Sequence, residues 1–263
     1  MEDQDDAELR GMLGRSVAQF VCLTPGERRK ILEDHLVQEE LVVIDEVDNN
    51  GSLKPKVAEG MRLRREDFVG SDATGKQLVE EALNVYYGGN IFYVRLHWLC
   101  EFLTDYPGDM VTAIPVAPFV RRIIVEVDIH DDHHYYWSCG DENEDEVEDE
   151  CPPDQLARWT LERLGDLHFF VKAEYIEVRL CGGGKSDGSD LATRRTIKDI
   201  AVFIGELIER FNRFGRRVVD ITKAVRGSNL PAQSILEYWN QPSEQAKKES
   251  IKRKSGIQGN NGN

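Results

Sequence analysis

Residues 75–94 carry the densest hydrophobic pattern of the chain. The apolar positions at helical spacing are Leu78, Ala82, Val85 and Tyr86. This spacing predicts an amphipathic helix, with Glu80 and Glu81 facing away from the core. We expect Gly88-Gly89 to stop the helix, because glycine reaches left-handed backbone angles without strain. The β-branched and aromatic run at 91–94 then predicts a short buried strand.

The helical and strand periods alternate along the rest of the chain. Strands are predicted around Ile91, Ile123, Ile176 and Val218, with amphipathic helices between them. In the strand predicted around Ile123, Glu126 and Asp128 alternate with apolar residues. Such alternation of strands and helices predicts an α/β fold, in which helices pack on a mostly parallel sheet. The strand spacing is irregular, which does not favour a strict repeat solenoid.

A helix start is encoded near the N-terminus. Thr24 is a suitable cap, Pro25 suits the first turn, and Glu27 completes a capping box. Ile31, Leu32 and Leu36 continue an apolar face along this helix.

These patterns divide the chain into four parts. We predict an acidic, partly disordered segment at 1–19, a helical segment at 20–45, an α/β domain at 61–241, and a disordered basic and polar tail at 242–263. Inside the domain, the run DENEDEVEDE repels itself and predicts a disordered acidic loop over 138–152.

Composition narrows the classes of function. The net charge of −15 disfavours nucleic-acid binding, because phosphates would be repelled. Five scattered cysteines indicate reduced thiols rather than a disulfide framework. The acidic N-terminus lacks the apolar core of a secretory signal, and no apolar run is long enough to span a membrane. We therefore expect a cytoplasmic or nuclear protein that binds no membrane.

The sequence EEALNVYYGGNIFYV resembles a signature of fungal F-box-like proteins, E-A-L-x-x-(F/Y)-Y-x-x-N-x-F. The matching residues are Glu81, Ala82, Leu83, Tyr86, Tyr87, Asn90 and Phe92. The resemblance implies structural roles here: Asn90 in the turn into the strand, and Phe92 in the core. It also implies a compact α/β domain.

The N-terminal helix resembles the opening of the same family, L-P-x-E-(L/F)-R-x-x-I, with one inserted residue. Arg28 stands where the family usually has an apolar residue. The resemblance implies that apolar residues of this segment contact a protein partner, the adaptor subunit of a ubiquitin ligase. The residues predicted to do so are Leu23, Pro25, Ile31, Leu32 and Leu36.

Two stretches carry residue types that could support chemistry. His130, His133 and His134 are metal-ligand types, but ligands so close in an extended chain point apart, so the spacing favours a solvated loop. The glycine-rich loop Cys181–Ser189 ends in Gly-Lys-Ser like a phosphate-binding loop, yet Arg179 and Asp187 break both nucleotide fingerprints. No nucleophile motif is present, so we predict no catalytic residue, no cofactor and no metal.

The sequence therefore predicts a non-enzymatic protein–protein interaction module, with substrate recognition for ubiquitin ligation as its concrete version. The alternative is a ligand-binding or enzymatic α/β domain. It would use the loops after the strands, Ile129–Asp132 and Cys181–Ser189, where open parallel sheets place their ligands.

Overall fold

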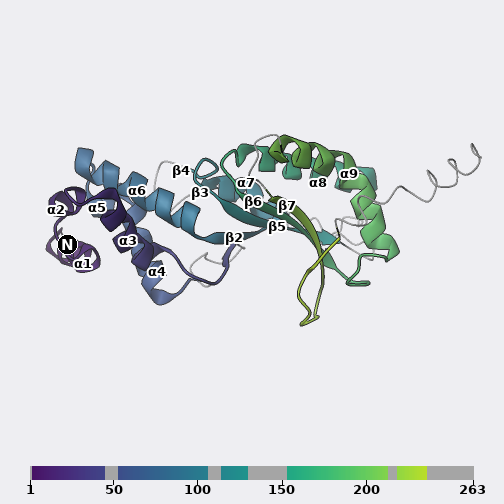
Figure 1. The fold of residues 1–263 in the computed structure, drawn as a ribbon, viewed down its shortest axis with the longest axis horizontal. Coiled ribbons are helices and arrows are strands. Elements are labelled where there is room, and N and C mark those ends of the chain that lie inside the picture. Colours follow the sequence, from purple (N-terminus) through teal and green to yellow (C-terminus); the bar gives the residue numbers. More distant parts are fainter. Residues whose placement is uncertain (1, 45–52, 106–113, 130–152, 213–217, 236–263) are drawn as a thin grey trace, which may run out of the picture.

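The computed structural model describes residues 2–44, 53–105, 114–129, 153–212 and 218–235. The chain folds into a helical end and a sheet end, which Figure 1 shows side by side along the longest axis. The acidic loop predicted over 138–152, the three candidate histidines and the tail from 242 lie outside the described residues.

The helical end is built from the chain up to residue 89, apart from the strand at 42–44, which joins the main sheet. Its helices are α1 (Glu2–Leu13), α2 (Val17–Val21), α3 (Pro25–Leu36), α4 (Pro55–Gly60), η1 (Met61–Arg64), α5 (Glu66–Val69) and α6 (Ala73–Gly89). The predicted capping box of α3 is confirmed, since Thr24 and Glu27 exchange hydrogen bonds between side chain and backbone.

The sheet end confirms the predicted α/β fold class. In the described residues, its main sheet has the order β1-β2-β5-β6-β7-β8, and every neighbouring pair is parallel except β7 and β8. The strands are β1 (Val42–Ile44), β2 (Ile91–Arg95), β5 (Arg122–Ile129), β6 (Tyr175–Gly182), β7 (Val218–Val225) and β8 (Gln233–Ser234). A second, two-stranded sheet pairs β3 (Thr104–Asp105) with β4 (Ile114–Pro115).

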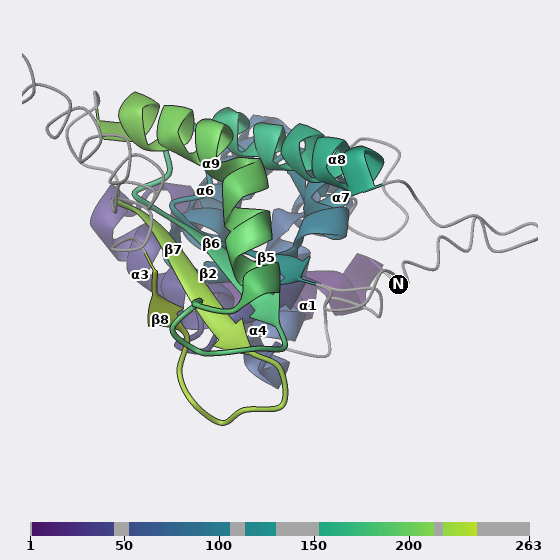
Figure 2. The same ribbon diagram turned by 90° about the vertical axis from the view of Figure 1, so that its right-hand side faces the viewer.

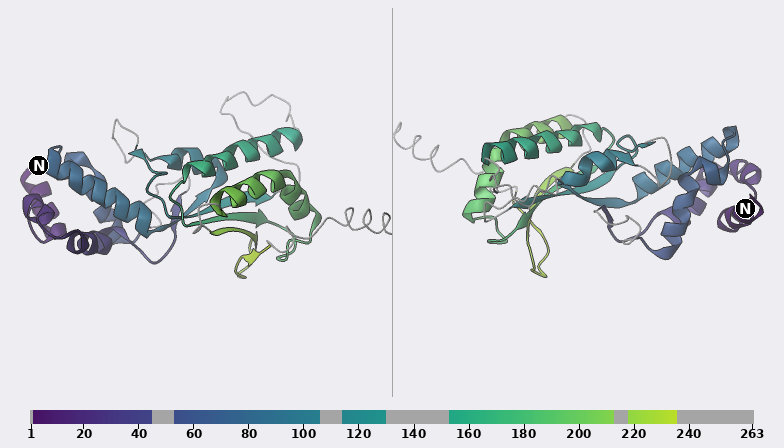
Figure 3. Two further views of the ribbon diagram at one scale, coloured as in Figure 1. Left: turned by 45° about the horizontal axis from the view of Figure 1, so that its top comes forward. Right: turned by 180° about the vertical axis from the view of Figure 1, so that it is seen from behind.

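Helices cover one face of the main sheet. They are α7 (Leu99–Leu103) after η2 (Leu96–Trp98), α8 (Pro153–Gly165) before η3 (Asp166–Phe169), and α9 (Leu191–Asn212). Figures 1 and 3 place α7, α8 and α9 on the same side of the strands, and Figure 2 shows α8 and α9 lying across them. No helix of the described residues lies on the opposite face.

Strand order explains this one-sided arrangement. From β1 to β7, each new strand is added on the same side of its predecessor. Crossovers between parallel strands have one preferred hand, so connections that always move in the same direction stay on one face. Alternate positions of the strands point to the helices and form continuous apolar rows. One such row is Val42, Phe92, Ile123, Ile176 and Val219.

Asn90 joins the helical end to the sheet. Its side chain is fully buried. Its amide nitrogen donates to the carbonyls of Leu36 and Tyr86, each at 2.8 Å, and its amide oxygen accepts from the Gln38 N–H at 3.0 Å. One side chain thus holds the end of α3, the end of α6 and the start of β2 together, which confirms its predicted place at the turn.

Arg28 makes a second link between α3 and α6. Its guanidinium donates to both carboxylate oxygens of Glu81, at 2.7 and 2.8 Å, and to the carbonyls of Val21 and Leu23. The Arg28 side chain therefore points inward. Glu81, which we expected to face away from the core, is its partner.

The helix α6 ends at Gly89, where the glycine pair predicts its stop. Neither Gly88 nor Gly89 has a positive φ, however. A Cβ at Gly89 would lie 2.5 Å from a methyl group of Val37, so this glycine permits close packing of α6 against the chain after α3. The prediction of a left-handed stop was wrong, because close approach also requires glycine.

The structure adds detail to two of the predicted parts of the chain. Residues 2–13 form α1, and its Leu9, Met12 and Leu13 are buried in the core, so this part of the segment at 1–19 is ordered. Residue 61 is not a boundary, because α4, η1, α5 and α6 belong to the helical end. The polar character of these short helices masked their period.

Replacing Asn90 tests this junction. Asn90→Ala removes three hydrogen bonds at a buried position, so we expect it to lower the free energy of unfolding by about 2–4 kcal/mol. The control is Asn84→Ala on the exposed face of the same helix, expected to stay within about 0.5 kcal/mol of the wild type. Equal effects of the two variants in urea unfolding would contradict this role for Asn90.

Candidate functional site

The sheet face away from the helices is polar. Its side chains include Tyr93, Arg95, Arg122, Ile124, Glu126, Asp128, Tyr175, Glu177, Arg179, Cys181, Asp220 and Thr222, which we call the open face. Parallel sheets are normally buried on both faces, and their strands are then apolar throughout. Strands that are both parallel and alternating mark a sheet with one face left polar.

Glu177 is the centre of this face. Its side chain is 6% exposed. One carboxylate oxygen accepts hydrogen bonds from Arg179 at 2.7 Å and from Thr222 at 2.6 Å, and the other accepts from the Tyr175 hydroxyl at 2.8 Å. Burial alone would raise the pKa of Glu177, but these hydrogen bonds outweigh it and hold the pKa below its ordinary value. Glu177 is therefore an ionised anchor for its neighbours.

Three potential metal ligands lie together further along β5 and β6. One ligand atom each from Glu126, Asp128 and Cys181 lies within 4.8 Å of the others. Arg226, directly after β7, forms an ion pair with Asp128. Arg95 lies 4.0 Å from the Glu126 carboxylate.

The charges around this cluster disfavour a metal ion. Burial and the Glu126 carboxylate raise the pKa of the Cys181 thiol, while burial and Asp128 raise the pKa of Glu126. A metal requires the deprotonated forms, and the Arg226 guanidinium already occupies Asp128. The cluster is better described as part of the ion-pair array of the open face.

The Asp190 carboxylate occupies the N–H donors of the glycine-rich loop and of the start of α9. Asp190 accepts hydrogen bonds from the Lys185 N–H at 3.1 Å, the Thr193 N–H at 2.9 Å and the Thr193 hydroxyl at 2.8 Å. Burial would raise the pKa of Asp190, but the donors from Thr193 and Lys185 keep it below its ordinary value. Asp190 thus sits where a phosphate would have to bind the loop and the start of α9.

The buried Lys223 also holds the glycine-rich loop in place. Lys223 has no exposed surface, and its ammonium donates to the Gly183 carbonyl at 2.7 Å. It also lies near Asp190 and contributes to lowering the pKa of that carboxyl. These contacts give the loop a fixed shape with an internal charge balance.

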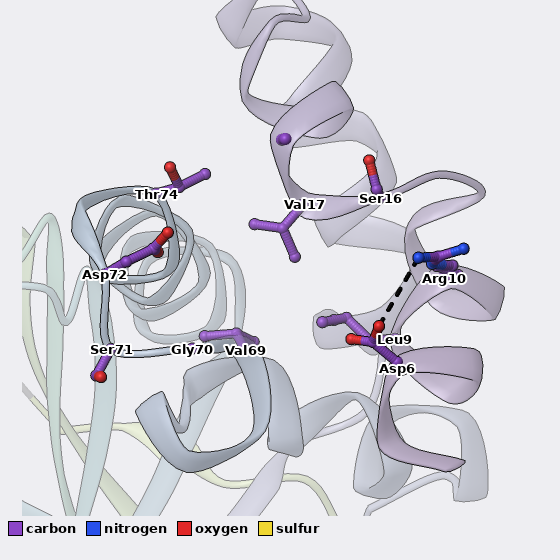
Figure 4. Close-up of a pocket in the computed structure, with 11 residues that line it drawn as sticks. Asp6, Leu9, Arg10, Ser16, Val17, Val69, Gly70, Ser71, Asp72 and Thr74 are labelled. Carbon is purple, nitrogen blue, oxygen red and sulfur yellow. Dashed lines mark ion pairs between the residues drawn. The ribbon is translucent and has the colours of Figure 1, made fainter. Parts of the chain in front are cut away.

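A surface hollow of about 420 Å³ lies in the helical end, between α1, the start of α2 and the turn from α5 into α6. Figure 4 shows Val17 between Thr74 on one side and Leu9 on the other, with Asp6, Arg10 and Ser16 along the α1–α2 side. The hollow is lined by apolar side chains together with hydroxyl and carboxylate groups. The sequence pattern did not indicate it, because its walls come from residues more than fifty positions apart.

The residues predicted to contact a partner are divided by the structure. Leu32 and Leu36 are fully buried in the core. Pro25 is exposed, and Leu23 and Ile31 are half-buried. Only these last three are accessible to a partner in this fold, because the inner side of α3 packs on α6.

No protein-family model, no curated protein and no solved structure matches this chain. None of the helices in the described residues is long and apolar enough to cross a membrane.

The open face has a signal in the sequence. Polar pairs recur two residues apart in consecutive strands: Glu126 and Asp128, Glu177 and Arg179, Asp220 and Thr222. Read together, they predict one polar face across three strands. The first pair alone indicates only a strand with one polar side, because the sequence does not show which strands are neighbours.

The role of Glu177 predicts a pH-dependent stability. Because its pKa is lowered on folding, its contribution is present above the ordinary glutamate pKa and is lost as the pH falls through the folded-state value. We expect Glu177→Gln to lower the free energy of unfolding by about 1–3 kcal/mol at neutral pH. The difference from the wild type should shrink in acid.

The control for this measurement is Glu174→Gln, at an exposed position just before β6, which we expect to be nearly neutral. Urea unfolding from pH 7 to about pH 3 gives the comparison. A gap between Glu177→Gln and the wild type that stays constant over this range would contradict the assignment.

The metal cluster gives a further prediction. We expect zinc at about 0.1 mM not to raise the melting temperature through Glu126, Asp128 and Cys181. A site with a dissociation constant above about 1 mM would stabilise the folded state by less than roughly 0.1 kcal/mol at this concentration. A rise of several degrees that Cys181→Ser abolishes would overturn this reading. A rise that persists in Cys181→Ser and disappears in His133→Ala would belong to the histidines instead.

Proposed function

We propose that this chain is a non-enzymatic protein that recognises a protein partner through the open face of its sheet. The observation that carries the proposal is a polar sheet face with no helix of the described residues over it, on which Arg95 is exposed and Tyr93 and Tyr175 are half-buried. Arginine and tyrosine are enriched among residues that dominate binding energy at protein interfaces.

The sheet topology supports recognition of a protein over binding of a small molecule. Open α/β sheets bind small ligands in the crevice where the strand order reverses. From β1 to β7 in the described residues, the order never reverses. The glycine-rich loop, the other place where a small anion could bind, is already filled by Asp190.

The concrete version of the proposal is substrate recognition for ubiquitin ligation, in the cytoplasm or the nucleus. It follows from the resemblance to fungal F-box-like proteins. In this version the helical end binds the ligase adaptor and the open face binds the substrate. The exposed Pro25 and the half-buried Leu23, next to the loop between α2 and α3, offer the surface for the adaptor.

A ligand-binding or enzymatic function is the second candidate. The grouping of Glu126, Asp128 and Cys181 favours it, because these residues lie close to the ends of β5 and β6, where the loops Ile129–Asp132 and Cys181–Ser189 begin. The zinc measurement above decides whether the cluster binds a metal.

Binding to purified adaptor subunit tests the ubiquitin-ligase version. We expect the immobilised full chain to retain the adaptor, and the variant Leu23→Glu with Pro25→Glu to lose most of this binding. The variant changes residues outside the fully buried core, and its melting temperature verifies that it folds.

The control is Lys198→Glu, on the exposed side of α9 at the other end of the molecule, which should retain the adaptor as the wild type does. No retention by the wild-type chain would refute the adaptor version. Equal retention by the double variant would exclude this surface as the contact.

A further inference from the structure

We infer that the open face binds a carboxylate-rich, extended segment of a partner protein, with Arg95, Arg179 and Arg226 as its contacts. This inference rests on the proposed function and names the chemistry of the partner.

The acidic and basic side chains of the open face lie at different depths. The side chains of Glu126 and Glu177 are only 10% and 6% exposed. Those of Arg95 and Arg226 are 50% and 57% exposed. Asp128 and Arg179 lie between these values, at 25% and 21%. The guanidinium groups of Arg95 and Arg226 are therefore the most exposed of these charged groups. A partner approaching this face meets positive charge first, although the numbers of acids and bases are similar.

The arginines keep hydrogen-bonding capacity for a ligand. A guanidinium has five N–H donors in a planar fork that fits a carboxylate. The contact of Arg95 with Glu126, at 4.0 Å, is too long for a hydrogen bond. Arg226 donates one side-chain hydrogen bond to Asp128 and interacts with the Cys181 thiol. Arg95 and Arg226 can therefore each take a carboxylate oxygen without first losing a buried partner.

One of the three arginines, Arg179, is also partly fixed before binding. Arg179 is held by its 2.7 Å hydrogen bond to Glu177 and lies 5.4 Å from the ring centre of Tyr93. Glu177 is in turn fixed by Tyr175 and Thr222. Restricting side-chain freedom in advance lowers the entropy lost on binding. The hydrogen bonds that fix Arg179 through Glu177 thus reduce the entropy cost of binding a partner at this face.

The carboxylates under Arg95 and Arg226 set the length of the partner segment. Arg95 approaches Glu126, and Arg226 reaches back over the sheet to Asp128, two residues further along β5. At about 3.3 Å per residue, two residues of a strand span roughly 7 Å. A stretch of about three extended acidic residues can therefore contact both guanidinium groups.

The net charge of the whole chain does not prevent such binding. The chain carries −15, which repels an acidic partner at long range. At physiological salt, however, charges are screened beyond about 8 Å, so the arginines in contact dominate over acids elsewhere. Binding should therefore be of moderate strength and should weaken as the salt concentration rises.

Fluorescence anisotropy with labelled hexaglutamate tests the inference on the full chain. We expect saturable binding that weakens from about 50 mM to about 300 mM salt, and none for labelled hexalysine. The double variant Arg95→Gln with Arg226→Gln should bind at least about tenfold more weakly. Both residues are at least half exposed, and the melting temperature of the variant verifies the fold.

The matched control is Arg194→Gln with Arg195→Gln, two exposed arginines on α9, which should change the affinity less than about twofold. Equal weakening by both double variants, or absence of binding, would overturn the inference. Binding that appears only when residues 141–150 are replaced by a glycine–serine linker would also overturn it, since the chain's own acidic run would then be the occupant. Adaptor retention is a separate readout, so failure here is distinguishable from failure of the ubiquitin-ligase version.

Discussion

The direction in which the sheet grows is the constraint on which the rest of the structure depends. Each strand from β1 to β7 is added beside the one before it, always on the same side. The connections then have no reason to change faces, and α7, α8 and α9 all pack on one side. The other face must be compatible with water, which requires polar side chains at alternate positions of strands that would otherwise be apolar throughout.

Polar side chains in the middle of a sheet are stable only if their hydrogen bonds are satisfied. The open face meets this condition through shared partners. Glu177 accepts from three neighbours on β6 and β7, and Asp128 on β5 pairs with Arg226 beyond the end of β7. Such a network leaves Glu126 and Glu177 buried and the ends of Arg95 and Arg226 exposed. The same arrangement that makes the uncovered face stable thus gives it a chemical preference for carboxylates.

The sequence predicted the periodic features of this fold. The helix over 75–87, the strand that follows it and the capping box at Thr24 depend on neighbouring residues, so a local pattern reveals them. The links between distant segments could not be predicted in this way. Arg28 and Glu81 are 53 residues apart, and each alone is typical of an exposed helix position. Asn90 was expected only to suit a turn, whereas its three hydrogen bonds also reach the end of α3.

The candidate site could be predicted only in part from the sequence, for a similar reason. The polar residues of β5, β6 and β7 alternate visibly, but the order of the strands decides whether they form one surface. The depth of each charge depends on its neighbours in three dimensions. For the predicted adaptor contacts at 23–36, the sequence pattern predicts which positions are apolar but not which of them a partner could reach. Leu32 and Leu36 pack inside the molecule.

Arginine-specific labelling of the full chain with phenylglyoxal, followed by mass spectrometry, tests the central claim most directly. The account predicts fast modification of Arg95 and Arg226, which protrude from an uncovered face, and slow modification of Arg28, which is 9% exposed and paired with Glu81. Protection of Arg95 and Arg226 to the same degree as Arg28 would show that the face is covered, and would contradict the account.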